Sequence, residues 1–148
     1  MSDPTPILLV EDNIADVELT LRAFKKRGVS NPIMVARDGE EALDYVHRRG
    51  VFADGAPTPG IILLDLRLPK VDGLEVLKEL KAHPVYRHVP VVVLTTSAED
   101  RDIKRSYELG ASSYIVKPVE FEKFRDVVER IDLYWIVTNV PYPASQAG

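Results

Sequence analysis

The sequence predicts an α/β fold of the flavodoxin-like, doubly wound type, with five parallel strands and five helices. Short apolar runs alternate with stretches whose apolar residues recur every three or four positions, which is the pattern of repeated β–α–β units. The apolar runs stand at 7–10, 33–36, 61–64, 91–94 and 113–116. Because the connections between them are short, right-handed crossovers into one parallel sheet are the economical arrangement.

The helices are predicted from apolar spacing and from the residues at their ends. The first lies between Asn13, a suitable N-cap, and Gly28, a usual helix end. Its predicted apolar face consists of Ile14, Val17, Leu21 and Phe24. The second helix follows Asp38-Gly39 and ends in a basic pair before Gly50, and the third stops before Pro84.

The later part of the chain continues the same alternation. The segment 51–59 is rich in Gly, Pro and Asp and is predicted to be a loop. The fourth helix begins among the acids near 98–100, which suit a helix start, and runs to Gly110. The fifth runs from about Val119 to Tyr134. We therefore expect one domain over residues 1–134 and a tail over 135–148.

Length and composition indicate a single globular domain. The chain has 148 residues, of which 45% are hydrophobic, both ordinary for one domain. Its first four residues lack the basic and apolar segments of a secretory signal, and no apolar run approaches the roughly 20 residues that cross a membrane. We expect a cytoplasmic protein without a membrane partner.

Two features of the composition exclude classes of function. The absence of cysteine excludes a disulfide framework, a thiolate metal site and a cysteine nucleophile. The net charge of −4 argues against nucleic acid as the main partner, because phosphate backbones require a basic face.

Polar residues of complementary chemistry stand at the ends of four predicted strands. These are Glu11-Asp12 after the first strand, Asp65 after the third, Thr95 at the end of the fourth and Lys117 after the fifth. Ligands of doubly wound sheets bind at the carboxyl ends of the strands. The order of acid, acid, hydroxyl and amine therefore predicts one site that binds a divalent cation and accepts a phosphoryl group.

The expected metal is Mg²⁺ or Mn²⁺, held by oxygen ligands. Mg²⁺ usually takes one or two carboxylates together with water and a phosphate oxygen, so Asp12 and Asp65 are the expected direct ligands. Glu11 is expected to act through water, and the backbone carbonyl of Arg67 is a further candidate ligand. The cation would also relieve repulsion among the three carboxylates, which would otherwise raise their pKa values.

The expected chemistry is nucleophilic attack by the Asp65 carboxylate on phosphorus. Lys117 would neutralise charge on the phosphoryl oxygens, and Thr95 would donate a hydrogen bond to one of them. Each residue alone has a simpler explanation, as a helix cap, a turn residue or a surface lysine. Their occurrence together, at the ends of four strands that would meet at one edge of the sheet, makes these simpler explanations much less economical.

These positions resemble the response-regulator receiver domains of two-component signalling. The resemblance covers residues 6 to about 132, with Thr95 lying 30 positions after Asp65 and Lys117 lying 52 after it. It includes the early acidic pair, the sequence Leu-Asp-Leu-Arg-Leu-Pro around Asp65, Asp72-Gly73, and Gly110-Ala111 ahead of Lys117-Pro118.

The resemblance implies a signalling phosphoacceptor rather than an enzyme acting on a small molecule. A sensor histidine kinase would phosphorylate Asp65. The protein would promote this phosphoryl transfer to itself, and it would also promote its own dephosphorylation, which would be slow. Thr95 would move toward the phosphate, and the ring of Tyr114 would turn inward behind it. Arg67 departs from the family, where Asn is common at this position, so we expect an altered lifetime of the aspartyl phosphate.

A narrower resemblance points to the single-domain regulators paired with bacterial and cyanobacterial phytochromes. It rests on Asp12-Asn13-x-x-Asp16, on residues 36–42, and on Tyr134-Trp135 followed by Asn139 and Pro141. A phytochrome is accordingly a candidate kinase partner.

The aromatic residues near the C-terminus suggest self-association. Phe121, Tyr134 and Trp135 place apolar rings in helix five and the tail, and Tyr and Trp are favoured at interface hot spots. A two-fold homodimer is the sharper hypothesis, and a tail that folds back on its own domain is the alternative.

Other functions are less well supported. A non-switching scaffold of the same fold would not need the intact set of acids, hydroxyl and lysine, but it stays the main alternative. A phosphatase of related topology typically carries a second Asp where this chain has Arg67. A flavin carrier would have a Ser-, Thr- and Gly-rich first loop, whereas Glu11-Asp12-Asn13 would repel a phosphate that lacks a cation. We expect a stand-alone regulator without a DNA-binding domain.

Overall fold

Five short β-branched and leucine-rich runs form the strands of one parallel sheet, in the order β2-β1-β3-β4-β5. The structure is a computed structural model that describes residues 5–117. The strands are β1 (Ile7–Val10), β2 (Ile33–Ala36), β3 (Ile61–Leu64), β4 (Val91–Thr95) and β5 (Ser113–Val116). The predicted flavodoxin-like sheet is thereby confirmed.

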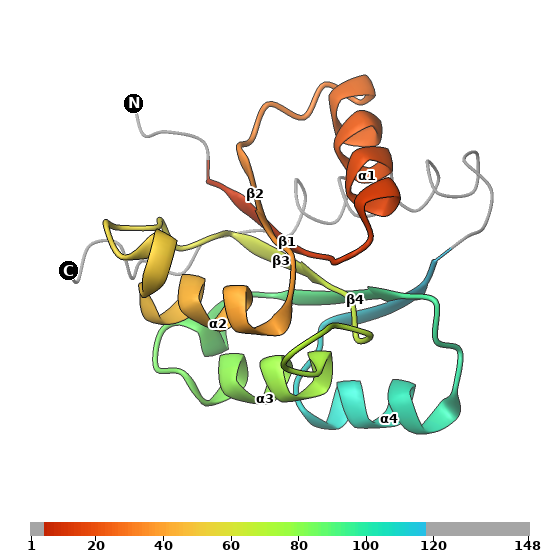
Figure 1. Ribbon diagram of the computed structural model, residues 1–148. Helices are drawn as coiled ribbons and strands as arrows, with labels where there is room; N and C mark the ends of the chain where they lie inside the picture. Colours follow the sequence, from red (N-terminus) through yellow and green to blue (C-terminus); the bar gives the residue numbers. More distant parts are fainter. Residues whose placement is uncertain (1–4, 118–148) are drawn as a thin grey trace.

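Helices connect the strands and cover both faces of the sheet (Figure 1). They are α1 (Ile14–Lys26), α2 (Gly39–His47), α3 (Gly73–Ala82) and α4 (Asp100–Glu108), with 3-10 turns η1 (Gly50–Phe52) and η2 (Tyr86–His88). Figure 1 shows α1 on one face and α2, α3 and α4 on the other. The predicted fifth helix, with Phe121, Tyr134 and Trp135, lies outside the described residues.

Because side chains alternate along a strand, the sheet divides the apolar residues into two cores. Leu8, Val10, Ile62 and Leu64 join the core beneath α2 and α3. Ile7, Leu9, Ile61 and Leu63 join the core beneath α1, together with Val17 and Phe24 of that helix. The central strands β1 and β3 are buried along their whole length, which makes them a rigid support for the residues that follow them.

Two details differ from the sequence prediction. Ile14 does not belong to the buried face of α1, since it is 57% exposed. It is the first residue of α1, beyond the last residue of β1. Helix α2 ends on Arg48 in the left-handed conformation, with φ 54°, and not directly on a glycine; Gly50 instead begins η1.

Side-chain caps fix where two helices begin. Asn13 Oδ1 accepts a hydrogen bond of 3.0 Å from Asp16 N and caps α1, as predicted. Asp38 Oδ1 accepts one of 2.7 Å from Glu41 N and caps α2. These caps satisfy backbone donors that the first turn of a helix leaves unpaired, and they hold α1 close to the end of β1.

Gly73 lets α3 begin directly against the residues that follow β3. A Cβ at this position would lie 2.4 Å from the Asp65 carbonyl oxygen and 2.5 Å from Leu66 Cα. Gly73 N also donates a 3.0 Å hydrogen bond to the Leu66 carbonyl. The start of α3 therefore fixes the backbone of Asp65 from one side, while β3 fixes it from the other.

Candidate functional site

The strand register brings the predicted site residues to one edge of the sheet. Val10 of β1 pairs with Leu64 of β3, so the acids that follow both strands lie level with each other. Thr95 of β4 pairs with Val116 of β5, which places Lys117 directly beside the end of β4. The sheet itself therefore sets the spacing of the site.

Backbone hydrogen bonds extend the sheet by one residue at three of these positions. Glu11 N donates to the Ala36 carbonyl at 2.9 Å, and Asp65 N donates to the Val10 carbonyl at 3.0 Å. Lys117 N donates to the Thr95 carbonyl at 2.7 Å. The backbone of each of these three predicted site residues is therefore held by the same kind of hydrogen bonds as the strands.

Three carboxylates converge at this edge. Glu11, Asp12 and Asp65 each offer an oxygen, and these oxygens all lie within 4.8 Å of one another. Glu11 and Asp65 are only 3% and 6% exposed, whereas Asp12 is exposed. This all-oxygen donor set fits a hard divalent cation such as Mg²⁺ or Mn²⁺, with Asp12 open to the water molecules that complete its shell.

Lys117 is the cation at the centre of the acids. Its ammonium donates to Asp65 Oδ2 at 2.9 Å and to Asp16 Oδ2 at 2.8 Å, and it also contacts the Glu11 carboxylate. Burial acts to lower the pKa of Lys117, but the hydrogen bonds to these acids outweigh it and hold the pKa above its usual range. Lys117 therefore stays charged.

The buried position of Glu11 changes its ionisation. Burial raises the pKa of Glu11 to about 7, with the Asp65 charge adding to the effect and Lys117 opposing it. One ammonium among so many carboxylates leaves an excess of negative charge at the site, and a divalent cation would relieve it.

Asp65 has a protein donor on each of its oxygens. Its Oδ1 accepts a 3.1 Å hydrogen bond from Arg67 N, and its Oδ2 faces Lys117. These bonds orient the carboxylate and leave lone pairs on both oxygens. The Asp65 carboxylate is therefore held in one orientation at the edge of the sheet.

Sequence reasoning did not include Asp16 among the site residues, although it holds Lys117. Asp16 is on the first turn of α1, three residues after the N-cap Asn13. Its place in the first turn of the helix that directly follows Glu11-Asp12 was the signal that could have identified it.

Thr95 and Tyr114 meet through a residue that the sequence analysis passed over, Ser97. Thr95 is fully buried, and its Oγ1 accepts a 3.4 Å hydrogen bond from Ser97 N. The hydroxyl of Tyr114 donates to the Ser97 carbonyl at 2.8 Å. Ser97 therefore contacts both of the residues that were expected to respond to phosphate.

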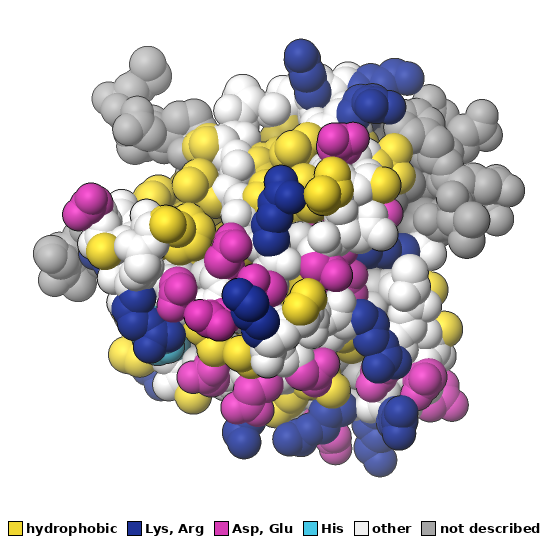
Figure 2. Space-filling view, viewed as in Figure 1, with side chains coloured by type: hydrophobic (Ala, Val, Ile, Leu, Met, Phe, Trp, Pro, Cys, Tyr) yellow, Lys and Arg dark blue, Asp and Glu magenta, His cyan; other side chains and the backbone are white. Residues whose placement is uncertain are grey.

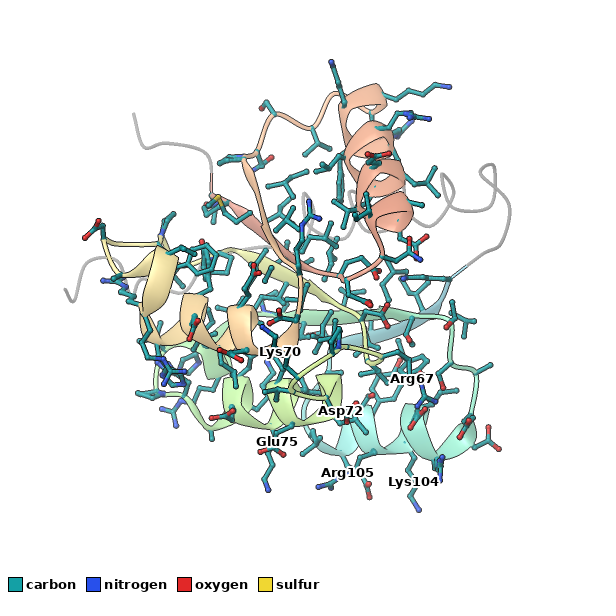
Figure 3. All side chains as sticks on the ribbon, viewed as in Figure 1. Arg67, Lys70, Asp72, Glu75, Lys104 and Arg105 are labelled. Carbon is teal, nitrogen blue, oxygen red and sulfur yellow. The ribbon has the colours of Figure 1, made fainter. Side chains whose placement is uncertain are left out.

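The side chain of Arg67 turns toward α4. Its guanidinium donates to Asp102 Oδ2 at 3.1 Å and lies 3.6 Å from Glu99. In Figure 3 the labelled Arg67 lies on the side of the β3–α3 loop nearer α4, whereas Lys70, from the same loop, lies nearer α2. Lys70 accordingly pairs with the N-cap of α2, Asp38, at 3.6 Å. Asp102 is a further residue that sequence reasoning missed.

The surface around the site carries both signs of charge. Figure 2 shows Lys, Arg, Asp and Glu side chains intermixed over its lower part, where α3 and α4 lie, rather than a broad field of one sign.

Among residues 5–117, no helix is long and apolar enough to cross a bilayer.

Comparison with known proteins gives a consistent family. The response regulator receiver domain family matches residues 7–129. The Probable methanogenesis regulatory protein FilR2 of Methanothrix harundinacea is 48% identical over 145 residues, covering 96% of this chain and 91% of that protein. Response regulator Rcp1 of Synechocystis is 39% identical over 142 residues, covering 96% and 95% of the two chains.

Solved structures agree with the sequence comparison. The phosphorylated cyanobacterial phytochrome response regulator RcpA superposes with a TM-score of 0.86 at 40% identity, covering 93% of this chain and 97% of that one. The Mn²⁺-bound form of Rcp1 superposes with a TM-score of 0.87 at 38% identity, covering 94% and 99%.

Proposed function

The chain belongs to the response regulator receiver family, and we propose that Asp65 is its phosphoacceptor, charged by a sensor histidine kinase. The observation that carries this proposal is the buried Asp65 carboxylate, held between Arg67 N at 3.1 Å and Lys117 Nζ at 2.9 Å beside two further acids. A carboxylate, a lysine and a cation site are the parts that phosphoryl transfer to an aspartate requires.

The transfer itself forms one bond and breaks one. An Asp65 oxygen attacks phosphorus as the phosphorus–nitrogen bond of a phosphohistidine breaks, and the imidazole nitrogen leaves with the electron pair and takes up a proton from water. Lys117, released from Asp65 Oδ2, would then pair with a phosphoryl oxygen. The Thr95 hydroxyl, which accepts a long bond of 3.4 Å from Ser97 N, is free to donate its proton to another.

A metal ion is part of this proposal. Asp12 and Asp65 would hold Mg²⁺ or Mn²⁺ directly, with Glu11 acting through water and the Arg67 carbonyl as an additional ligand. The bound cation supplies charge neutralisation for the phosphoryl oxygens. The residues alone would otherwise present several carboxylates and a single ammonium to an incoming dianion.

The output of the proposed switch is a change in protein contacts. Movement of the Thr95 hydroxyl toward the phosphoryl group would remove the acceptor of the Ser97 N–H, and Tyr114 is bound to the same residue through the Ser97 carbonyl at 2.8 Å. Thr95 and Tyr114 are thus mechanically connected, which supports their assignment as the switch pair. The chain would act as a signalling protein and would hydrolyse its own phosphoryl group slowly.

A phytochrome is the proposed source of the phosphoryl group. RcpA is described as a phytochrome response regulator, and the sequence motifs at 12–16, 36–42 and 134–141 agree with such regulators. FilR2, at 48% identity, carries a methanogenesis name instead, so similarity alone does not choose the kinase. Phosphotransfer from purified candidate kinases, with a phytochrome kinase among them, would choose it.

We also propose that residues 1–134 form the receiver unit and that Phe121, Tyr134 and Trp135 contribute to a homodimer. Sedimentation of the full chain, beside a chain that ends at Leu133, would test this at micromolar concentration with and without phosphorylation. A monomer under all conditions would exclude the dimer.

The decisive test of phosphoacceptor function is intact mass after incubation with acetyl phosphate and Mg²⁺. We expect the wild type to gain one phosphoryl group, and we expect neither Asp65→Asn nor the metal-free protein to gain any. A wild type that gains nothing from acetyl phosphate or from any histidine kinase would favour a non-switching scaffold of the same fold.

A further inference from the structure

One charged contact joins the loop after β3 to helix α4. The Arg67 guanidinium donates to Asp102 Oδ2 at 3.1 Å. The Asp102 side chain is only 12% exposed, whereas that of Arg67 is 55% exposed. The anion is therefore fixed in the domain, and the cation is the partner that has room to leave.

Asp102 is connected to both proposed switch residues through Ser97. The Ser97 hydroxyl donates to the same Asp102 Oδ2 at 2.6 Å. The Ser97 backbone in turn contacts Thr95 through its N–H and Tyr114 through its carbonyl. Ser97 is therefore bonded directly to Asp102, Thr95 and Tyr114, so a change at Asp102 reaches both switch residues through Ser97.

Helix α4 depends on these polar contacts for its position. Its buried residues are Asp102 and Ser106, whereas α3 buries Val76, Leu77 and Leu80. Ser106 donates its hydroxyl back into α4, to the Asp102 carbonyl at 2.7 Å. Because the buried residues of α4 are polar, the hydrogen bonds and the ion pair of Asp102 contribute a large part of the interactions that hold this helix against the domain.

We propose that Asp102 is a positioning residue that holds the Arg67 guanidinium on α4, and that a phosphoryl group on Asp65 draws Arg67 away from it. This inference rests on the proposed function of Asp65. Arg67 is two residues from Asp65, and its N–H already donates to that carboxylate. A guanidinium matches the oxygens of a phosphoryl group in geometry and charge.

The exchange has a consequence on each side. At the acceptor, Arg67 adds a second cation beside Lys117. At α4, Asp102 loses the cation that neutralises it and keeps the Ser97 hydroxyl, so a buried carboxylate is left undercompensated. The Asp102 contact therefore opposes occupation of the acceptor, and its loss loosens α4 and the loop before it.

The test is titration of the full-length chain with beryllofluoride and Mg²⁺, a stable mimic of the phosphoryl group, followed by amide NMR. Asp102→Asn retains an acceptor for Ser97 but removes the charge that holds Arg67. We expect it to bind beryllofluoride about three- to fivefold more tightly than the wild type, the size expected for the loss of one half-exposed ion pair. In an Arg67→Gln background, the same substitution should change the affinity by less than about twofold.

Glu99→Gln is the matched control. Glu99 also lies near Arg67, at 3.6 Å, but its side chain is 51% exposed, so its loss should leave the affinity nearly unchanged. A merely structural Asp102 would shift the affinity equally in the presence and absence of Arg67, and that result would overturn the proposal. So would an Asp102→Asn affinity equal to or weaker than that of the wild type.

A second measurement does not depend on any variant of Asp102. In the wild type, the side-chain Nε signal of Arg67 and the amide signal of Ser97 should shift when beryllofluoride binds. Binding at Asp65 with both signals unmoved would refute the exchange alone. If the wild type binds no beryllofluoride and Asp65→Asn behaves identically, the proposed function fails, and this inference fails with it.

Discussion

Replacing Gly73 by alanine tests whether the backbone of Asp65 is as tightly enclosed as the structure shows. The new Cβ would lie 2.4 Å from the Asp65 carbonyl oxygen and 2.9 Å from Leu66 C, both shorter than real Cβ contacts. Either α3 or the Asp65–Leu66 backbone must move by roughly 1 Å to reach an ordinary contact distance. Overpacking of this kind costs about 1–3 kcal/mol.

The higher helix propensity of alanine offsets part of this cost. Alanine is favoured over glycine in a helix by about 1 kcal/mol, and Gly73 is absent from the residues with positive φ among those described, so alanine suffers no backbone strain there. The net expectation is a loss of up to about 2 kcal/mol, or up to roughly 8 °C in melting temperature for a chain of this size.

The assay is urea unfolding of the wild type and Gly73→Ala, together with the rate of labelling by acetyl phosphate. Gly39→Ala is the matched control, because its Cβ would meet the Val71 carbonyl oxygen at 2.0 Å, six residues beyond Asp65. Both variants should lose stability, and Gly73→Ala should slow labelling more. A Gly73→Ala protein more stable than the wild type, with unchanged labelling, would show that the close approach does not constrain Asp65.

Three further predictions concern single side chains. Arg48→Gly should raise the free energy of unfolding by about 1 kcal/mol in urea titrations, because Arg48 adopts φ 54°, which costs an L-residue about that much; an unchanged midpoint would contradict this. Burial, with His47 adding to it, lowers the pKa of His83 below 6.5, so the unfolded chain takes up a proton first as the pH falls. Stability should therefore be full above pH 6.5 and decline as the pH falls through the folded pKa, and His83→Asn should show a smaller decline over pH 7.5–5. Lys117→Gln should slow acetyl phosphate labelling by about a hundredfold or more while Mg²⁺ binding, measured by calorimetry, is retained or tightened; near-normal labelling would remove Lys117 from the mechanism.

The fold was predictable because its signals are local and repeated. Each predicted strand agrees with the structure to within a residue, since a buried parallel strand is a continuous apolar run. Ile14 was assigned wrongly because helical periodicity identifies a face but not how far the underlying sheet extends. Arg48 was unexpected as a left-handed helix end because glycine is the usual residue there, and the sequence offered Gly50 two positions later.

The site was predictable only where its residues end strands. Asp65, Thr95 and Lys117 follow apolar runs directly, so the topology of the sheet brings them together without knowledge of any side-chain conformation. Asp102 and Ser97 carry no such signal, because the Asp102 contact depends on the direction that the Arg67 side chain takes, and the Ser97 contacts depend on the path of the loop after β4. That direction is set by packing between the β3–α3 loop and α4, which no spacing along the chain records.

Charge connects the acceptor site with the Arg67 contact. The acids at the sheet edge exceed the single ammonium of Lys117, and burial raises the pKa of Glu11 to about 7, with Lys117 opposing the effect and the Asp65 charge adding to it. An aspartyl phosphate would carry about one and a half to two negative charges in place of the single charge of the Asp65 carboxylate, so phosphorylation would increase the excess of negative charge. A divalent cation is one source of positive charge, and Arg67, two residues after Asp65, is another. Asp102 holds Arg67 at 3.1 Å, so the proposed movement of Arg67 toward a phosphoryl group on Asp65 would remove a contact of α4.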